Sequence, residues 1–229
     1  MMPVKLVVFD MAGTTVRDNQ DVSKAFRAAM ATEGYDVPLK VIDLFMGYEK
    51  PYAISKMLEK YERIPEKITP TLISTIHRAF VTQMIEHYRS TPDIEALPHV
   101  EETFAALHLK GIKIGLNTGF SRDIAQTIVK RLQWEEKGLI DYVVGSDEVE
   151  KGRPHPFMIA EMMTRAGITD PRQVVKIGDT EVDVREGQNA GCKYVIGITT
   201  GSFTRIELEF FAPTHIIDDM AELMAIIEP

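Results

Sequence analysis

Residues 7–16 read VVFDMAGTTV, an apolar run that ends in one acid and continues into a small, flexible turn. Val7, Val8 and Phe9 are typical of a strand buried on both faces, where polar and apolar residues do not alternate. Asp10 follows this strand directly. Ligands bind beyond the carboxyl ends of the strands in open α/β sheets, so Asp10 is a candidate functional group.

Five more apolar runs follow, and amphipathic helical stretches such as 99–111 and 121–134 separate them. Near-continuous apolar strands that alternate with helices are typical of a parallel sheet covered on both faces. The sequence therefore predicts an α/β fold with a doubly wound parallel sheet. The predicted strands after the first are 112–118, 141–146, 174–179, 193–199 and 214–219.

One long region interrupts this alternation, from residue 17 to residue 95. Its periodic stretches, of which 69–90 is the longest, have the spacing of helices and not of strands. A connection of this length is not expected inside a compact sheet. We therefore predict a core domain formed by residues 1–16 and 96–229, and a helical cap domain formed by residues 17–95.

The composition is that of an ordinary globular protein, with 229 residues, 45% hydrophobic, 26% charged and a net charge of −8. No basic patch with interleaved aromatics points to nucleic acid, and no apolar run approaches the ~20 residues of a membrane span. The N-terminus does not resemble a signal peptide, so we expect a cytoplasmic protein. The single cysteine, Cys192, is predicted to be a small buried hydrophobe. The oligomeric state is open, with a homodimer as one option.

Polar side chains also stand at the ends of other predicted strands. Thr118 ends one, Asp179 ends another, Asp183 follows four residues later, and Arg153 lies between them in KGRPHP. Carboxylates hold Mg²⁺, whereas a hydroxyl and a guanidinium bind phosphoryl oxygens. Each residue alone is also typical of a helix cap or a turn. Together they favour phosphoryl transfer to the carboxylate of Asp10.

The four segments DMAGT, LNTG, KGRPHP and GDTEVD resemble the four motifs of the haloacid dehalogenase-like (HAD) hydrolases. The resemblance covers nearly the whole chain, including the place of the helical insert. It implies a Rossmann-like core with a cap inserted after the first strand, a Mg²⁺ cofactor and an aspartyl-phosphate intermediate. The four motifs are specific as a set, although no single motif identifies the family.

The resemblance also implies a role for each matching residue. Asp10 is the nucleophile, Thr118 binds the phosphoryl group, and Arg153 takes the place of a motif lysine that orients both. The implied metal site comprises Asp10, the carbonyl of Ala12, Asp179 and, in the outer shell, Asp183. The implied contacts to a small anionic substrate are Ala12, Gly13, Thr14, Gly47, Tyr48, Asn117 and Gly119.

Ala12 departs from the pattern of most HAD phosphatases, which resemble DxD at this position. The second acid of that pattern protonates the leaving alkoxide and later activates water, and such help is worth roughly 10²–10⁴-fold. Without it, the protein is a weak phosphatase, has a leaving group that needs no proton, or cleaves a different bond.

The phosphonatase (phosphonoacetaldehyde hydrolase) subgroup resembles the chain here, with DxAGT and an arginine before the proline of the third motif. Its members cleave a P–C bond, and a cap lysine forms an imine with the substrate aldehyde to accept the bond electrons. Lys50, in FMGYEKPYAI, matches that lysine. The histidine that follows three residues later in the subgroup is Ala53 here.

The sequence therefore predicts a Mg²⁺-dependent phosphonatase-like hydrolase of a small phosphonate such as phosphonoacetaldehyde. The alternatives are a phosphatase of a small phosphate ester and a weakly catalytic phosphate-binding protein. A phospho-receiver would be about half as long and would need an acidic pair near its first strand. A dehalogenase would leave the acids of GDTEVD unexplained.

Overall fold

A six-stranded, all-parallel sheet forms the centre of the computed structural model, which describes residues 2–92 and 94–227. The strands lie in the order β3-β2-β1-β4-β5-β6, and Phe9 of the first strand is paired with Leu116 on one side and Ile177 on the other. All six predicted strands are confirmed. They are β1 (Leu6–Phe9), β2 (Lys113–Thr118), β3 (Tyr142–Gly145), β4 (Val174–Gly178), β5 (Tyr194–Ile198) and β6 (His215–Ile217).

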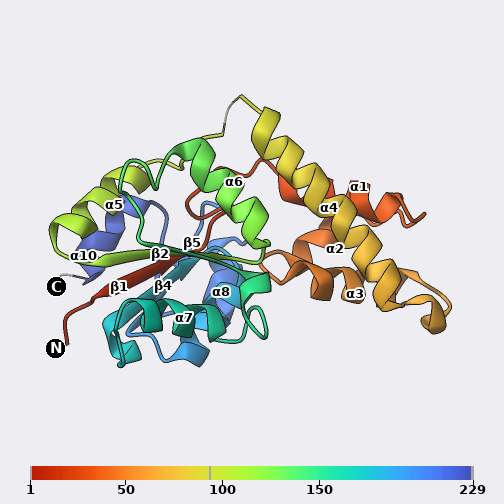
Figure 1. Cartoon of the computed structure of the whole chain (residues 1–229). Coiled ribbons are helices and arrows are strands. Elements are labelled where there is room, and N and C mark those ends of the chain that lie inside the picture. The colour runs from red at the N-terminus through yellow and green to blue at the C-terminus, as the bar shows by residue number, and fades with distance from the viewer. Residues whose placement is uncertain (1, 93, 228–229) are drawn as a thin grey trace.

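This strand order places β1 where the direction of winding reverses, since β2 and β3 lie on one side of it and β4 to β6 on the other. Helices cover both faces of the sheet, as predicted (Figure 1). One face carries α5 (Val100–Leu109), α6 (Arg122–Leu132) and α10 (Leu223–Ile227), and the other carries α7 (Phe157–Arg165), α8 (Glu181–Ala190) and α9 (Arg205–Phe210).

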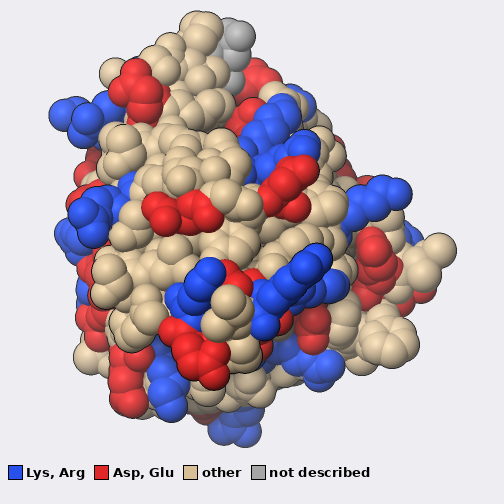
Figure 2. Space-filling view, turned by 90° about the vertical axis from the view of Figure 1, so that its right-hand side faces the viewer, with Lys and Arg blue, Asp and Glu red and all other residues tan. Residues whose placement is uncertain are grey.

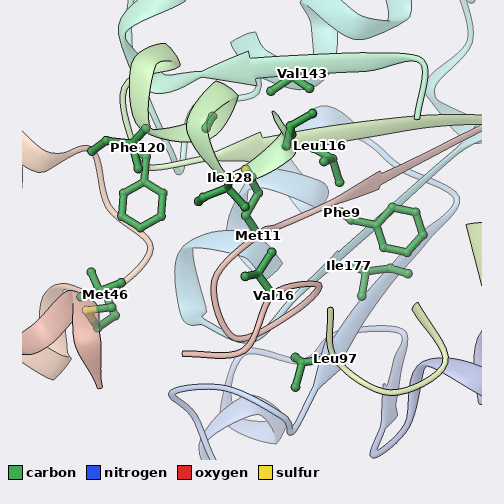
Figure 3. Packing of buried hydrophobic residues seen from close by; sticks show 14 of the residues in the cluster. Phe9, Met11, Val16, Met46, Leu97, Leu116, Phe120, Ile128, Val143 and Ile177 are labelled. Atoms are coloured by element: carbon green, nitrogen blue, oxygen red, sulfur yellow. The ribbon is translucent and has the colours of Figure 1, made fainter. Parts of the chain in front are cut away.

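Side chains of β1 are buried on both faces of the sheet, which explains its unbroken apolar sequence. Val7 and Phe9 belong to the largest hydrophobic cluster, whereas Leu6 and Val8 belong to a second cluster under α7. Figure 3 shows Phe120 and Met46 at the end of the first cluster that lies away from Phe9. The largest cluster thus continues from the sheet toward the helical segment.

The segment 17–95 is helical, as predicted, and lies beyond the carboxyl ends of the strands (Figure 1). Its longest helix begins where expected, because the side chain of Thr69 accepts a hydrogen bond from Leu72 N (3.2 Å) and Pro70 occupies the first turn. Its helices are α1 (Asp21–Ala31), α2 (Leu39–Ile42), α3 (Lys50–Tyr61) and α4 (Pro70–Ser90), with 3₁₀ turns at Asp43–Phe45 and Pro65–Lys67.

Two sets of backbone and side-chain hydrogen bonds join this segment to the core near the points where the chain leaves and returns. Val16 and Ala96 form an antiparallel bridge where the chain leaves and returns. Arg131 of α6 donates hydrogen bonds to the carbonyls of Tyr88 (3.0 Å) and Thr91 (2.9 Å) at the end of α4. A division into domains at residues 16/17 and 95/96 fits these contacts and stays a prediction.

The surface on the side of the helical segment carries acidic and basic groups interspersed with uncharged ones (Figure 2). Across residues 2–92 and 94–227, no helix combines the length and the apolar character that crossing a bilayer requires. Cys192 is less buried than predicted, because it is only partly covered between two hydrophobic clusters. Burial still raises the pKa of its thiol to about 12, which makes it a poor nucleophile.

Candidate active site

The loop after β1 places Asp10 at the switch point of the sheet, with only 5% of its surface exposed. The carbonyl of Met11 accepts hydrogen bonds from Thr15 N (2.8 Å) and Val16 N (2.9 Å), so the chain turns tightly behind the acid. Gly13 has φ +89°, and a Cβ there would lie 2.8 Å from Asp179 Oδ2. Glycine is therefore required for this loop to approach the loop after β4.

Asp179 follows β4 and is held from two directions. Thr14 Oγ1 donates to its Oδ1 (3.1 Å), and Ser202 N donates to its Oδ2 (2.6 Å). Asp183, in the first turn of α8, packs over Gly178, where a Cβ would lie 2.1 Å from its Cγ. The glycine of GDTEVD thus lets the second acid of that motif approach the strand end.

Asp10, Asp179 and Asp183 are all buried, and one carboxylate oxygen from each lies within 4.8 Å of the others. Burial and the neighbouring acids raise the pKa of Asp179 to about 8, and burial raises the pKa of Asp10. Burial acts in the same direction on Asp183, but Arg153 and Lys176 hold its pKa below the usual value. This oxygen-rich, like-charged group fits a divalent cation, which would relieve the repulsion between the acids.

Arg153 contacts two of these acids, Asp10 and Asp183, and each of its three nitrogens has an acceptor. Nη1 donates to Asp10 Oδ1 (2.6 Å) and forms an ion pair with Asp183 Oδ1 (2.9 Å). Nη2 donates to the carbonyl and side-chain oxygens of Asn117, and Nε donates to Glu186 Oε2 (3.1 Å). The guanidinium is therefore fixed in one orientation against the predicted nucleophile.

Two buried charged residues of this site were not predicted. Lys176 is the third residue of β4 and contacts Asn117 Oδ1 (2.7 Å), Asp183 Oδ1 (3.0 Å) and Glu186 Oε2 (3.4 Å). Glu186, on the inner side of α8, accepts from the amide of Asn117 (2.8 and 2.9 Å). A lone lysine within the apolar strand VVKIG was the signal for the first, since an unpaired charge is not tolerated there.

Thr118 and Gly119 lie at the end of β2. Thr118 Oγ1 accepts a hydrogen bond from Phe120 N (3.1 Å), which leaves its hydroxyl hydrogen available to an anionic oxygen. A Cβ on Gly119 would lie 2.6 Å from the carbonyl of Gly47 and 2.4 Å from that of Tyr48. The loop before α3 is therefore closed directly over the predicted phosphoryl-binding loop.

Lys50, the first residue of α3, enters the same cavity as Asp10 from the opposite side, with 3% of its surface exposed. Its Nζ donates to the carbonyl of Tyr48 (3.2 Å) and lies 4.9 Å from the ring centre of Phe120 and 5.4 Å from that of Phe26. Within the described residues, no carboxylate lies within 4.0 Å of this nitrogen. Burial lowers the pKa of Lys50 to about 8.

The cavity that Asp10 and Lys50 share is narrow, with about 20 Å³ open to the centre of a water-sized sphere, which is room for about one water molecule. The predicted residues that line it are Asp10, Ala12, Gly47, Lys50, Thr118, Gly119 and Asp179, and the unpredicted ones are Val22, Met46, Phe120, Thr180 and Ser202. The predicted residues that lie beside it without lining it are Gly13, Thr14, Tyr48, Asn117, Arg153 and Asp183. Aromatic walls such as Phe120 carried no signal in the sequence, because they come together only in the fold.

Two of those neighbours face other groups. The side chain of Asn117 is fully buried against Arg153, Lys176 and Glu186, and the ring of Tyr48 stacks on that of Tyr52 with 5.3 Å between ring centres. Contact of either side chain with a substrate stays a prediction. For Tyr48, the group that reaches the site is the backbone carbonyl bound to Lys50.

Residues 7–197 match the model of the family described as haloacid dehalogenase-like hydrolase. The chain belongs to this family and is a hydrolase of this class, so the resemblance drawn from the four motifs is confirmed. The matched range covers most or all of five of the six strands of the sheet, together with Asp10, Thr118 and Asp179.

Curated relatives are named phosphonoacetaldehyde hydrolases. That of Hahella chejuensis (strain KCTC 2396) is 31% identical over 209 residues, which cover 86% of this chain and 69% of the relative. The bifunctional phosphonoacetaldehyde hydrolase/aminoethylphosphonate transaminase of Clostridioides difficile (strain 630) is 31% identical over 87% of this chain, but the chain spans only 32% of that protein. Among solved structures, a predicted phosphoglycolate phosphatase from Haemophilus somnus 129PT has a TM-score of 0.82 at 23% identity over the full length of both chains.

Proposed function

We propose that the protein is a Mg²⁺-dependent, phosphonatase-like hydrolase that cleaves the P–C bond of a small carbonyl phosphonate such as phosphonoacetaldehyde. The observation that carries this proposal is the buried amine of Lys50, whose pKa is lowered to about 8, in one cavity with Asp10. The names of the curated relatives support the same substrate class.

Lys50 makes the P–C bond breakable. Its free amine adds to the substrate carbonyl, water leaves, and an imine forms. The protonated imine can accept the electron pair of the breaking bond, so no free carbanion arises. Ala12 is consistent with this chemistry, because a carbon leaving group of this kind needs no acid two residues after the nucleophile.

Asp10 receives the phosphoryl group. Its carboxylate forms a bond to phosphorus while the P–C bond breaks and leaves an enamine on Lys50. The hydroxyl of Thr118 orients the phosphoryl oxygens, and Arg153 holds the attacking carboxylate. Water then hydrolyses the aspartyl phosphate to phosphate, and protonation and hydrolysis of the enamine return the aldehyde product and the free lysine.

The metal site suits this role. Asp10, Asp179 and the carbonyl of Ala12 would hold Mg²⁺, with Asp183 behind them among Arg153, Lys176 and Thr180. When bound, the ion offsets the charge between the carboxylates and an anionic substrate.

A phosphatase of a small phosphate ester is the second candidate. It is favoured by Ala53, which is fully buried in α3 and provides no acid–base group beside the lysine. In that case Lys50 stays protonated and serves as a cation for the substrate.

The deciding experiment measures phosphate release from phosphonoacetaldehyde and from a panel of phosphate esters, with Mg²⁺ and with excess chelator. We expect Mg²⁺-dependent release from the phosphonate. Asp10→Asn should lower it by roughly 10⁴-fold or more while the protein stays folded, as removal of a covalent nucleophile does elsewhere. Release from esters alone would leave the second candidate, and full turnover by Asp10→Asn would sink both.

A further inference from the structure

Arg153 sits in a bracket of buried polar groups that the reaction described above does not use. Asn117 accepts hydrogen bonds from its Nη2, and Glu186 accepts one from its Nε. Only Nη1 faces Asp10 and Asp183. The side chains of Arg153 and Glu186 are both fully shielded from solvent. Such a planar fork has five donors in fixed directions, so binding three of them on one side sets the direction of the other two.

Glu186 is a buried carboxylate, and its desolvation costs more free energy than that of the neutral amide of Asn117. A buried carboxylate is tolerated only when it is paired and hydrogen-bonded. Here its oxygens accept from Asn117 Nδ2 (2.8 and 2.9 Å) and Arg153 Nε (3.1 Å), and Lys176 lies 3.4 Å away as a counter-charge. Glu186 does not line the cavity that contains Asp10, so it cannot act on a substrate directly.

The fold supports this placement. Gly187 follows Glu186 in α8, and a Cβ there would lie 2.9 Å from Cβ of Lys176 and 2.9 Å from Val195. A larger residue would therefore move α8 away from β4 and draw Glu186 away from Arg153. The glycine keeps the helix close enough for the carboxylate to reach the guanidinium.

We propose that Glu186 is a positioning residue that acts through Arg153: it holds the guanidinium so that Nη1 orients the carboxylate of Asp10. This inference rests on the proposed role of Asp10 as the nucleophile. The proposal also implies that Arg153 acts on the nucleophile and not on the substrate. All three nitrogens of Arg153 already have acceptors, and Arg153 does not line the cavity.

The test compares Glu186→Gln in the wild-type background and in an Arg153→Lys background. In the wild-type background we expect kcat to fall about 10–100-fold with KM within about 3-fold, the scale seen when groups behind a reactive ligand are removed. Both oxygens of Glu186 accept hydrogen bonds, whereas glutamine keeps one acceptor and turns an NH2 group toward the donors of Asn117 and Arg153. In the Arg153→Lys background the same change should cost less than about 3-fold, because lysine has no Nε for Glu186 to hold. Equal losses in both backgrounds, or no loss, would overturn the proposal.

A second readout separates orientation of Asp10 from turnover. Trifluoroberyllate with Mg²⁺ mimics a phosphoryl group bound to a carboxylate oxygen, and its affinity can be measured by ¹⁹F NMR. Glu186→Gln should weaken it about 10-fold or more in the wild-type background alone. This probe needs neither a phosphonate nor Lys50, so it tests the role of Glu186 even if the substrate is an ester. If the wild type cleaves the P–C bond but Glu186→Gln leaves the trifluoroberyllate affinity unchanged, the role of Glu186 is refuted and the proposed function is not.

Two further variants keep the test decisive. If Glu186→Gln does not fold, Glu186→Asp replaces it: the charge beside Lys176 is retained, but the shorter side chain no longer reaches Arg153 Nε, so the same losses are expected. Glu161→Gln is the matched control, since Glu161 also accepts from an arginine Nε (Arg165, 2.8 Å) but lies on the surface of α7. It should leave kcat and trifluoroberyllate affinity unchanged.

Discussion

Two buried lysines approach the site from opposite sides, and their surroundings differ completely. Lys176, from the sheet, contacts Asp183, Glu186 and Asn117 within 3.4 Å. Lys50, from the helical segment, meets two aromatic rings and one backbone carbonyl. The first is held in ion pairs with buried acids, whereas the second is an amine whose protonated form burial disfavours.

The difference shows how one residue type serves two purposes in one site. A buried lysine that is paired with carboxylates is held in place as their counter-charge. Aromatic partners contribute only roughly 0.5–2 kcal/mol by cation–π contact, too little to offset the loss of solvation at Lys50. The sheet side of the site is therefore rich in ion pairs, whereas the helical segment contributes an amine with a lowered pKa, as the proposed imine chemistry requires.

The largest effect that separates the two lysines is covalent trapping. With phosphonoacetaldehyde and borohydride, Lys50 should gain the mass of the reduced adduct and Lys176 should not. Lys50→Arg keeps the positive charge but cannot form an imine, so P–C cleavage should fall by at least about 10²-fold, on the scale of losing a catalytic group. Mass spectrometry of peptides and phosphate release measure both results.

An adduct on Lys176, or a Lys50→Arg variant with unchanged P–C cleavage, would contradict this assignment. The variant also tests the second candidate function. If phosphate esters are the substrates, arginine should serve as well as lysine in attracting them, and their hydrolysis should change by less than about 3-fold.

A substitution at Ala12 tests the sheet side of this comparison. Ala12→Asp adds a carboxyl group on the wall of the cavity that contains Asp10, and the backbone carbonyl proposed for the metal is unaffected. Hydrolysis of a phosphate ester with a poor, alkoxide-like leaving group should increase, with an upper limit of roughly 10²–10⁴-fold and less if the acid is imperfectly placed.

An ester whose leaving group is already stable is the internal control, because a general acid helps it far less. Equal gains for both esters, or no gain in a folded variant, would mean that Ala12 does not limit ester hydrolysis. The helical segment would then decide the substrate.

The framework of this site was predictable because its parts are local. Asp10 and Asp179 directly follow strands and Thr118 is the last residue of one, and a strand end is visible in a run of apolar letters. The sheet order then brings those ends together without further information. Lys50 was also found in the sequence, but only through its resemblance to a family motif.

The pairing of the buried polar groups near Arg153 was not predictable for the opposite reason, although the lone Lys176 in VVKIG indicated a buried partner. Asn117, Lys176 and Glu186 come from β2, β4 and α8, and their meaning lies in contacts between residues up to 69 positions apart. The aromatic wall of Lys50 is similar, since Phe26 and Phe120 come from α1 and from the loop after β2. Such pairings depend on packing that no local period encodes.

The pH dependence of the reaction also separates the proposed roles of Lys50. With a pKa of about 8, the free amine falls about tenfold for each pH unit below 8, so kcat/KM for P–C cleavage should rise with pH and level off above 8. If the lysine only attracts an anionic ester, its protonated form is the active one, and kcat/KM should fall through the same range. Rates from pH 6 to 9 decide the sign, and Lys50→Arg should remove the inflection.

The smallest effect concerns the closure of the helical segment over the core. Glu49, directly before Lys50, accepts a hydrogen bond from Gly152 N (3.2 Å), directly before Arg153. A Cβ on Gly152 would lie 2.8 Å from Cβ of Glu49, so the two loops touch at this point. Glu49→Ala should loosen the closed arrangement and raise KM about 3–10-fold, the effect of one hydrogen bond, with kcat within about 2-fold.

Glu49→Gln is the matched variant, because an amide oxygen can still accept from Gly152 N, and its KM should stay within about 2-fold of wild type. Glu59→Ala, on the exposed side of α3 and ion-paired with Lys56, controls for a general loss of charge from the segment. A fall in kcat with unchanged KM in Glu49→Ala would show instead that Glu49 sets the position of Lys50 within the cavity. The contact between Glu49 and Gly152 would then help to place the amine of Lys50 for reaction. Closure of the helical segment would in that case do more than retain the substrate.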